Sequence, residues 1–128
     1  MNAEELKLRT KKFALGIIKL YQSLPKEKDA HVLGYQMLRS GTSVGANYRA
    51  SCRARSQADF ISKITIVEEE SDETAYWIEL LTESGIMKME LVKNLLKESN
   101  ELTAIFTSSG NMAKLTLNNP QSKIRNPQ

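Results

Sequence analysis

The sequence contains few of the residues on which disulfide bonding, metal binding and catalysis usually depend. It has one cysteine, Cys52, and one histidine, His31, among 128 residues. A lone cysteine cannot form a disulfide within the chain, which favours the reducing cytoplasm as its location. A di-iron site built from two Glu-x-x-His motifs requires two histidines, so it cannot be assembled here in that form. We therefore expect no cofactor, no metal and no catalytic residues.

Proline, glycine and long apolar runs are also scarce. Three prolines and six glycines provide few of the turns that a β-rich fold requires. No apolar run approaches the roughly 20 residues of a membrane span, and residues 1–20 intersperse charged with apolar residues, unlike a signal peptide. These absences predict a soluble cytoplasmic protein of one domain, without a membrane partner.

Four segments show the apolar spacing of amphipathic helices. We predict helices over residues 3–23, 27–53, 57–84 and 87–117. Two of their starts carry capping signals: Asn2 with Glu5 has the spacing of a capping box, and Ser56 with Asp59 suits a helix N-terminus. Four such segments with short turns predict an all-α fold, an antiparallel up-down-up-down four-helix bundle.

The predicted bundle domain covers residues 1–118. The remaining segment, 119–128, is rich in turn-forming residues and contains a single isoleucine. Such a composition offers little apolar surface for packing, so we predict a disordered tail.

The pentapeptide GTSVG, residues 41–45, fits the G-x-S-x-G pattern of the serine hydrolase nucleophile elbow. That function requires a strand before Ser43 and a histidine after it, but Ser43 lies within a predicted helix and His31 precedes it. Gly41 and Gly45 instead begin rows of small residues at i, i+4 spacing, which let a neighbouring helix approach closely. Each interior glycine costs about 1 kcal/mol relative to alanine, which close packing has to offset. We interpret the pentapeptide as a helix-packing motif.

Basic and acidic residues are segregated along the chain, whose net charge is +3. Residues 1–28 hold seven basic residues against three acidic ones, and residues 39–63 hold five against one. The segment EEESDE, residues 68–73, then places five acids in six positions. Segregation of this kind permits binding to a polyanion.

The acids of residues 68–73 cannot all share one face of a helix, because successive residues are about 100° apart. Some must face a neighbouring helix or subunit, where a buried carboxylate requires a cation such as Arg39 or Arg49. Acid–base catalysis or metal binding by these acids is a weaker alternative, because carboxylates without a recognisable pocket are poor evidence for an enzyme. We predict a structural polar network of Arg39, Asn47, Glu70 and Glu73.

The basic residues of the first helix and of the turn near residues 48–56 have two interpretations. They are either solvated charges or contacts to phosphate groups, since arginine matches phosphate oxygens and each neutralised phosphate releases counterions. The candidate nucleic-acid contacts are Lys7, Lys11, Lys12, Arg49, Arg53 and Arg55.

Residues 38–81 resemble the four-helix bundle proteins encoded by intervening sequences within bacterial large-subunit ribosomal RNA genes, often labelled S23 ribosomal proteins. The pattern combines R-S, S-[VI] and N, then an Arg/Ser-rich turn, F-I and a downstream Glu. The matching residues are Arg39, Ser40, Ser43, Val44, Asn47, Arg53, Ser56, Phe60, Ile61 and Glu73. The resemblance implies a homopentamer with a central channel and no catalytic residues. It also implies similarity to the accessory variability protein of diversity-generating retroelements, a basic pentamer that binds nucleic acid and a reverse transcriptase.

Two main hypotheses follow. The first is a non-enzymatic oligomeric helical bundle that binds RNA or DNA nonspecifically. The alternative is a protein-interaction scaffold, such as an accessory subunit for a nucleic-acid enzyme, with no direct nucleic-acid binding. An enzyme or metal protein that uses the acids of residues 68–73 is the third and most distant hypothesis.

Overall fold

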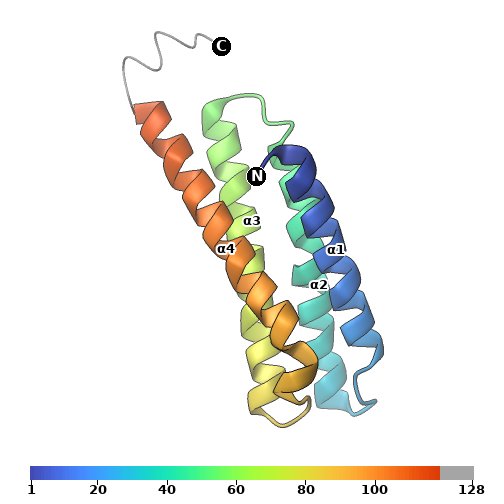
Figure 1. Cartoon of the computed structure of the whole chain (residues 1–128). Coiled ribbons are helices and arrows are strands. Elements are labelled where there is room, and N and C mark those ends of the chain that lie inside the picture. Colours follow the sequence, from blue (N-terminus) through green and yellow to red (C-terminus); the bar gives the residue numbers. More distant parts are fainter. Residues whose placement is uncertain (119–128) are drawn as a thin grey trace.

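A computed structural model describes residues 1–118, which form four α-helices joined by short connections (Figure 1). The helices are α1 (Ala3–Gln22), α2 (Lys28–Ser51), α3 (Gln57–Glu83) and α4 (Met89–Asn118). No strand occurs between residues 1 and 118, which confirms the prediction of an all-α fold with four helices. The tail predicted over 119–128 lies outside the described residues.

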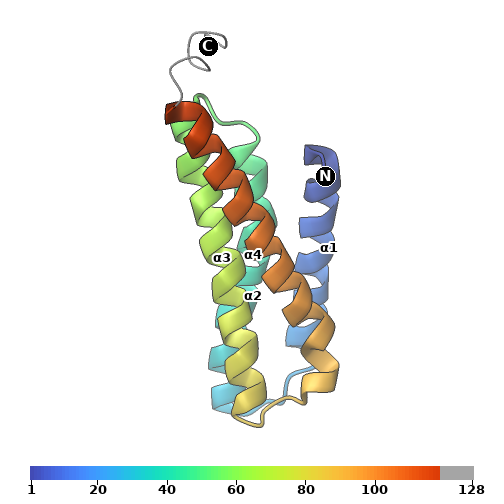
Figure 2. The same cartoon turned by 60° about the vertical axis from the view of Figure 1, so that its left-hand side comes forward.

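The helices pack in chain order. The α1–α2 and α3–α4 connections lie at one end of the molecule, and the α2–α3 connection lies at the other end, near the N-terminus (Figure 1). α2 packs against α1 and α3, and α3 packs against α4. α1 and α4 meet near the α3–α4 connection and diverge toward the opposite end, as Figure 2 shows. The two helices therefore share the smallest interface among the contacting pairs.

Local hydrogen bonds explain where the helices begin and end. The Asn2 side chain accepts a hydrogen bond from the Glu5 backbone N–H at 2.8 Å, and Ser56 accepts one from the Asp59 N–H at 3.0 Å. These are the two predicted N-terminal caps. α3 ends before Gly85, whose φ of 84° lies in the left-handed region that glycine adopts without strain.

α2 is shorter than the predicted 27–53 at its C-terminal end. Its last α-helical residue is Ser51. The Cys52 N–H still donates to the Tyr48 carbonyl, but the N–H groups after it form i→i−3 hydrogen bonds instead of the i→i−4 pattern. The Arg53 N–H donates to the Ala50 carbonyl at 3.1 Å, and the Ala54 N–H donates to the Ser51 carbonyl at 3.2 Å. Arg53 thus belongs to the α2–α3 connection rather than to α2.

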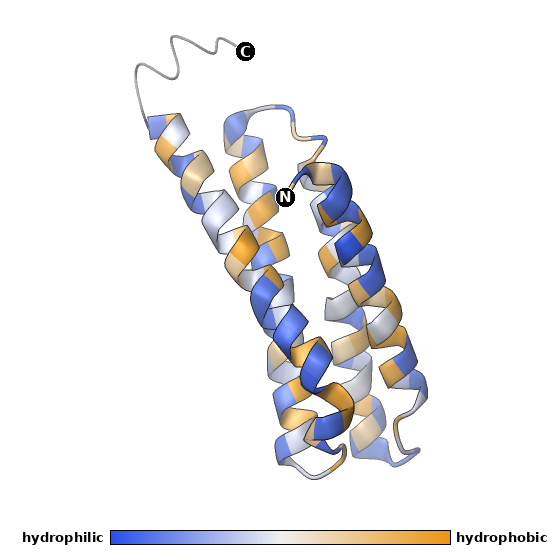
Figure 3. Cartoon of the chain, viewed as in Figure 1, coloured by the Kyte–Doolittle hydropathy of each residue, from blue (hydrophilic) through white to orange (hydrophobic). Residues whose placement is uncertain are grey.

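Fully buried apolar side chains from all four helices form the core. Ile17, Val44, Ile78 and Phe106, one from each helix, have no exposed surface. In Figure 3 each helix carries both hydrophobic and hydrophilic positions along its length, as amphipathic helices do. Burial of one apolar stripe per helix therefore holds the bundle together.

Small polar side chains inside the core are hydrogen-bonded between helices. The Thr74 hydroxyl of α3 donates to the Ser40 hydroxyl of α2 at 2.9 Å. The Ser99 hydroxyl of α4 donates to the Ser71 carbonyl of α3 at 2.6 Å. Because a buried hydroxyl without a partner is costly, these pairs fix how α2 and α4 are placed along α3.

The GTSVG segment lies within α2, where its glycines contact α1. A Cβ atom added at Gly41 would lie 2.9 Å from Ile17 Cγ1, and one added at Gly45 would lie 3.2 Å from Thr10 Oγ1. Ser43 continues the helix, and its hydroxyl donates to the Arg39 carbonyl at 2.7 Å. The interpretation as a helix-packing motif is confirmed, and the nucleophile-elbow geometry is absent from this segment.

Candidate nucleic-acid interface

A basic groove of about 200 Å³ runs between α1 and α2. Small residues of both helices line it, and cationic side chains flank them. Lys7 and Lys11 come from α1, and Arg49 comes from the last turn of α2. The other lining residues are Thr10, Ala14, Thr42, Gly45 and Ala46. The close approach of α1 at Gly45 therefore brings together three of the six predicted nucleic-acid contacts.

The three cations of the basic groove differ in their surroundings. The Lys7 ammonium pairs with the Glu4 carboxylate at 3.2 Å. Lys11 and Arg49 are exposed and take part in no ion pair within residues 1–118. The charges of Lys11 and Arg49 are therefore available to an external anion.

A second hollow, of about 300 Å³, lies at the α2–α3 connection and holds two more predicted contacts, Arg53 and Arg55. It also contains Lys63, which the sequence reasoning did not select, and Asp59. The Lys63 ammonium contacts Asp59 at 2.7 Å, and this hydrogen bond is the main cause of the lowered pKa of Asp59. The spacing of four residues between Asp59 and Lys63 was the only sequence signal for the pair.

The remaining predicted contact, Lys12, lines neither hollow. It is exposed on α1 and directed away from the groove side of that helix, because it follows Lys11 by one residue and so by about 100°. Arg9, another base of α1, is already engaged: its guanidinium contacts Glu98 and Glu101 of α4 at 2.7 and 2.9 Å. The hydrogen bond to Glu98 is the main cause of the raised pKa of Arg9. Hence the exposed cations on the N-terminal half of α1 lie on two faces, with Lys11 on the groove side and Lys12 on another.

The predicted polar network lies between α2 and α3. Arg39 forms ion pairs with both Glu73 and Glu70, the latter at 3.6 Å. The Trp77 indole N–H, which the sequence reasoning did not include, donates to Glu73 at 3.0 Å. Asn47 stands apart, because its amide donates to the Ser43 carbonyl of its own helix at 2.8 Å. Arg39 is thus the cation that meets the acids of residues 68–73.

Glu70 is the least well solvated member of this network. Its side chain is 17% exposed, and its Oε2 atom is buried without a hydrogen-bond donor. Burial is the main cause of the raised pKa of Glu70, and the negative charge of Glu73 is the second cause. The positive charge of Arg39 opposes the shift. The structure therefore disfavours the ionised form of this carboxyl group.

We expect Glu70→Gln to be more stable than the wild type at pH 7. A carboxyl group whose pKa is raised on folding loses its proton at a lower pH in the unfolded chain than in the folded one. Ionisation of such a group therefore favours the unfolded chain, and its contribution to stability is lost as pH rises above its unfolded-state pKa. The advantage of the variant should therefore shrink as pH falls from 7 toward the ordinary glutamate pKa of about 4.3, below which the ionisation of Glu70 no longer contributes to it. Urea unfolding followed by circular dichroism at pH 7, 5 and 4 measures this.

The exposed neighbour Asp72 provides the matched control, because Asp72→Asn removes the same charge without the same burial. A Glu70→Gln variant that is less stable than the wild type at pH 7 would show that the Arg39 ion pair outweighs the cost of burial. The comparison thus separates two opposing effects on one carboxyl group.

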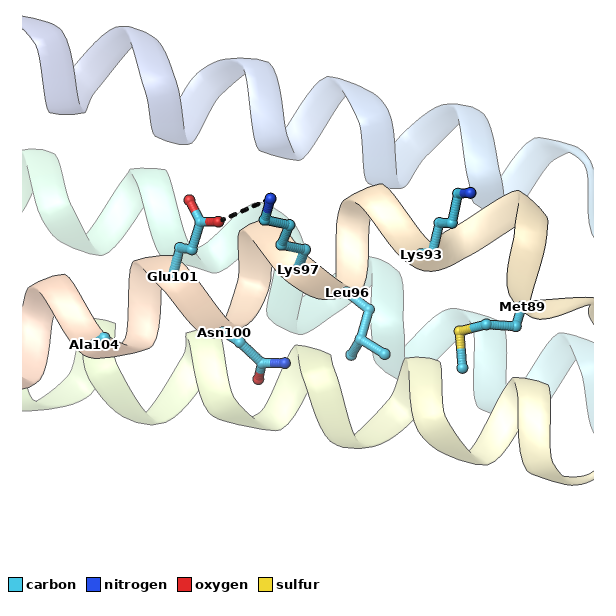
Figure 4. Close-up of a pocket in the computed structure, with 7 residues that line it drawn as sticks. All are labelled: Met89, Lys93, Leu96, Lys97, Asn100, Glu101 and Ala104. Atoms are coloured by element: carbon cyan, nitrogen blue, oxygen red, sulfur yellow. Dashed lines mark ion pairs between the residues drawn. The ribbon is translucent and has the colours of Figure 1, made fainter.

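A shallow depression on α4 is a poorer candidate for binding anions. Met89, Leu96 and Ala104 give it apolar surface, and Lys97 pairs with Glu101 at 4.0 Å (Figure 4). Within residues 1–118, no group of three or more His, Cys, Asp and Glu side chains is placed to hold a metal ion. No helix in the same range is long and apolar enough to span a membrane.

Comparison with known proteins identifies the family. The sequence model of the 23S rRNA-intervening sequence protein family matches residues 5–108. A crystal structure of a protein of unknown function from the S23 ribosomal protein family of Bacteroides thetaiotaomicron is similar, with 37% identity and a TM-score of 0.79. That similarity covers 87% of this chain and 99% of the other. No functionally curated protein matches the sequence.

The family match covers all of α2 and α3 and most of α1 and α4, including the basic groove and the polar network. The resemblance noted from Arg39, Asn47 and Glu73 is therefore confirmed across most of the chain. This protein belongs to the 23S rRNA-intervening sequence protein family.

Proposed function

We propose that this chain is a non-enzymatic, antiparallel up-down-up-down helical bundle of the cytoplasm that assembles as a homopentamer and binds RNA or DNA nonspecifically through phosphate groups. The observation that carries the binding proposal is the basic groove, where Lys11 and Arg49 converge from different helices without an ion-pair partner in the described residues. Arginine and lysine in such a position gain affinity by releasing counterions from phosphates.

The distribution of charge supports contact on this side of the bundle. The basic groove lies between α1 and α2, whereas the exposed acids Glu69 and Asp72 lie on α3, which does not contact α1 within the described residues. A polyanion is therefore attracted toward one side of the molecule and repelled from another. Small residues such as Ala14 and Ala46 leave room for a phosphate backbone to approach the helix surfaces.

The mode of binding that these groups support is nonspecific. Lys11 and Arg49 present charge to the phosphate backbone, and phosphate contacts position a nucleic acid without reading its sequence. Arg53 and Arg55, at the α2–α3 connection, extend the basic surface beyond the groove. We therefore expect similar affinities for unrelated RNA sequences at one salt concentration.

The test is the affinity for a labelled structured RNA and a DNA duplex, measured by fluorescence anisotropy across a salt series. For Lys11→Ala with Arg49→Ala, we expect weaker binding to both ligands. The slope of log affinity against log salt on the duplex should become less steep by about 2, since each neutralised phosphate contributes about 0.9. The matched control is Lys93→Ala with Lys114→Ala, which removes the same charge from exposed positions on α4.

Two results would contradict the proposal. One is an intact wild-type oligomer that binds neither ligand at low salt, which would favour the scaffold function with a protein partner. The other is an equal loss of affinity in the control variant, which would show that net charge rather than the basic groove determines binding. Circular dichroism and molar mass, measured in the same buffers, confirm that each variant is folded and assembled.

A further inference from the structure

We propose that subunits associate through two different helix faces, one on α1 of one chain and one on α3 of a second copy. This inference rests on the assembly proposed above and names the surfaces that form it. Each surface is a stripe of mostly exposed residues, distinct from the stripe that its helix buries in the core. The two stripes have opposite charge, and each carries exposed apolar side chains.

The cationic stripe of α1 consists of Leu8, Lys12, Leu15 and Lys19. Their spacing of four, three and four residues places them on one face of the helix. The core residues of α1, such as Phe13 and Ile17, occupy a different face. Leu8 is 68% exposed and Leu15 is 56% exposed, and neither lysine forms an ion pair within residues 1–118.

The acidic stripe of α3 has the same spacing over more turns. It consists of Ile66, Glu69, Glu73, Tyr76, Leu80 and Glu83. Tyr76 is 52% exposed and Ile66 is 41% exposed, so the apolar members of this stripe also remain accessible to solvent. Glu73 is held by Arg39, whereas Glu69 and Glu83 form no ion pair in the described part of the chain. Glu69 and Glu83 are fourteen residues apart, twice the separation of Lys12 and Lys19, so one register of the two stripes places one lysine opposite a free carboxylate.

These stripes cannot neutralise one another within a chain, because α1 and α3 do not contact each other in residues 1–118. In Figure 2, α3 and α1 lie on opposite sides of the view, with α2 and α4 between them. Between copies, Leu8 and Leu15 have Ile66 and Tyr76 as apolar counterparts, and lysines meet glutamates as in the flanking positions of coiled coils. A second copy of the chain therefore supplies the complementary partner for each stripe.

The geometry of such a contact determines the kind of assembly. A contact between two different faces is heterologous, so a growing row of subunits keeps one free stripe at each end until the last subunit closes a ring. A cyclic assembly of five subunits requires a contact of this type, because an isologous contact joins subunits only in pairs. The proposed contact is therefore compatible with an odd number of subunits.

To test the proposal, the charge of each stripe is reversed in turn. The protein is treated with nuclease before its molar mass is measured. One variant is Lys12→Glu with Lys19→Glu, and the other is Glu69→Lys with Glu83→Lys. We expect each variant alone to shift from the wild-type molar mass to the 14.4 kDa of one chain at micromolar concentration in light scattering. Lys93→Glu with Lys114→Glu, which changes the charge of α4 by the same amount, should keep the wild-type mass.

Mixing the two reversal variants gives a sharper result. In an equimolar mixture, the reversed α1 of one variant matches the reversed α3 of the other, so the mixture should associate although each component alone does not. A closed ring of alternating variants has an even number of subunits and so never contains five. A single chain that carries all four substitutions should regain the wild-type mass.

The outcomes distinguish the two proposals. A wild-type protein that is monomeric at all concentrations would overturn both the assembly and this contact. An oligomeric wild type whose reversal variants keep their mass, or fail to associate when mixed, would overturn the contact alone. Circular dichroism of each variant shows whether its helices are retained, since all four substituted side chains are exposed.

Discussion

The variant Phe106→Ala is expected to lose about 3–5 kcal/mol of its free energy of unfolding. Phe106 has no exposed surface, and its ring lies 5.4 Å from the ring of Tyr48, measured between centroids. Alanine removes both the buried apolar area and the aromatic contact, and it leaves a cavity that the rigid helices fill only in part. Urea unfolding at about 25 °C measures the loss, followed by circular dichroism at about 222 nm, the wavelength of the helical signal.

Phe60 provides the matched control for this prediction. It is only partly buried and packs at the edge of the same core, so Phe60→Ala should cost clearly less than Phe106→Ala. Equal losses would mean that the divergence of α1 and α4 lets the interior near Phe106 collapse around the missing ring. Unfolding midpoints and slopes measured together distinguish a change in stability from a change in the unfolded state.

The second large effect is expected at Gly41, the first residue of the GTSVG segment. A Cβ atom there would lie 2.9 Å from Ile17 Cγ1 and Cγ2, and 3.2 Å from its Cβ. These atoms surround the branch point of a fully buried side chain, so a rotation of the chain tip cannot relieve the clash. We expect Gly41→Val to lower the free energy of unfolding by up to about 3 kcal/mol, measured by the same urea titration.

Two other glycines are the controls for Gly41→Val, because alanine at either position meets no severe clash. At Gly110 the nearest atom to an added Cβ is Ile64 Cγ2 at 3.4 Å, which is close to ordinary contact. At Gly16 the close atom, at 2.9 Å, is the mobile tip of Leu95. The gain of about 1 kcal/mol in helix propensity should therefore dominate in Gly110→Ala and offset most of the cost in Gly16→Ala. A stabilising Gly41→Val would show that α1 is free to move away from α2.

The same close approach of α1 to α2 connects stability with the proposed function. Gly45 lies one turn after Gly41 and lines the basic groove, so these small residues bring Lys11 and Arg49 to one site. A variant that separates the helices changes the distance between these cations as well as the core. For this reason, Gly41→Val is unsuitable as a binding variant, whereas substitutions of exposed Lys11 and Arg49 leave the packing intact.

Sequence patterns alone determined the secondary structure and the family. Apolar residues at helical spacing predicted four helices, because burial of one stripe per helix is a local property of the sequence. Asn2 and Ser56 marked helix starts, since a capping side chain bonds to backbone groups only three residues away. The end of α2 was placed two residues too late, because nothing in the residues after Ser51 signals the change to i→i−3 hydrogen bonds.

The partners of the charged residues were decided only by the tertiary structure. The spacing of EEESDE showed that some acids must meet a cation and offered both Arg39 and Arg49, of which the predicted network took Arg39. Packing of α3 on α2 places Arg39 beside Glu70 and Glu73, and it leaves Arg49 in the groove with Lys11. Sequence separation carries no information on such distances, because they depend on how far each helix is shifted and rotated against its neighbour.

The division of the basic residues has the same physical origin. In the sequence, Lys7, Lys11 and Lys12 form one group, yet only the first two line the groove, because a helix turns about 100° between Lys11 and Lys12. That rotation is readable from the sequence, but which face of α1 borders α2 is set by the contacts of Gly41 and Gly45. The sequence by itself thus determined which helices form and which charges they carry. The tertiary structure decided which charges meet, because only packing brings residues of different helices within reach of one anion.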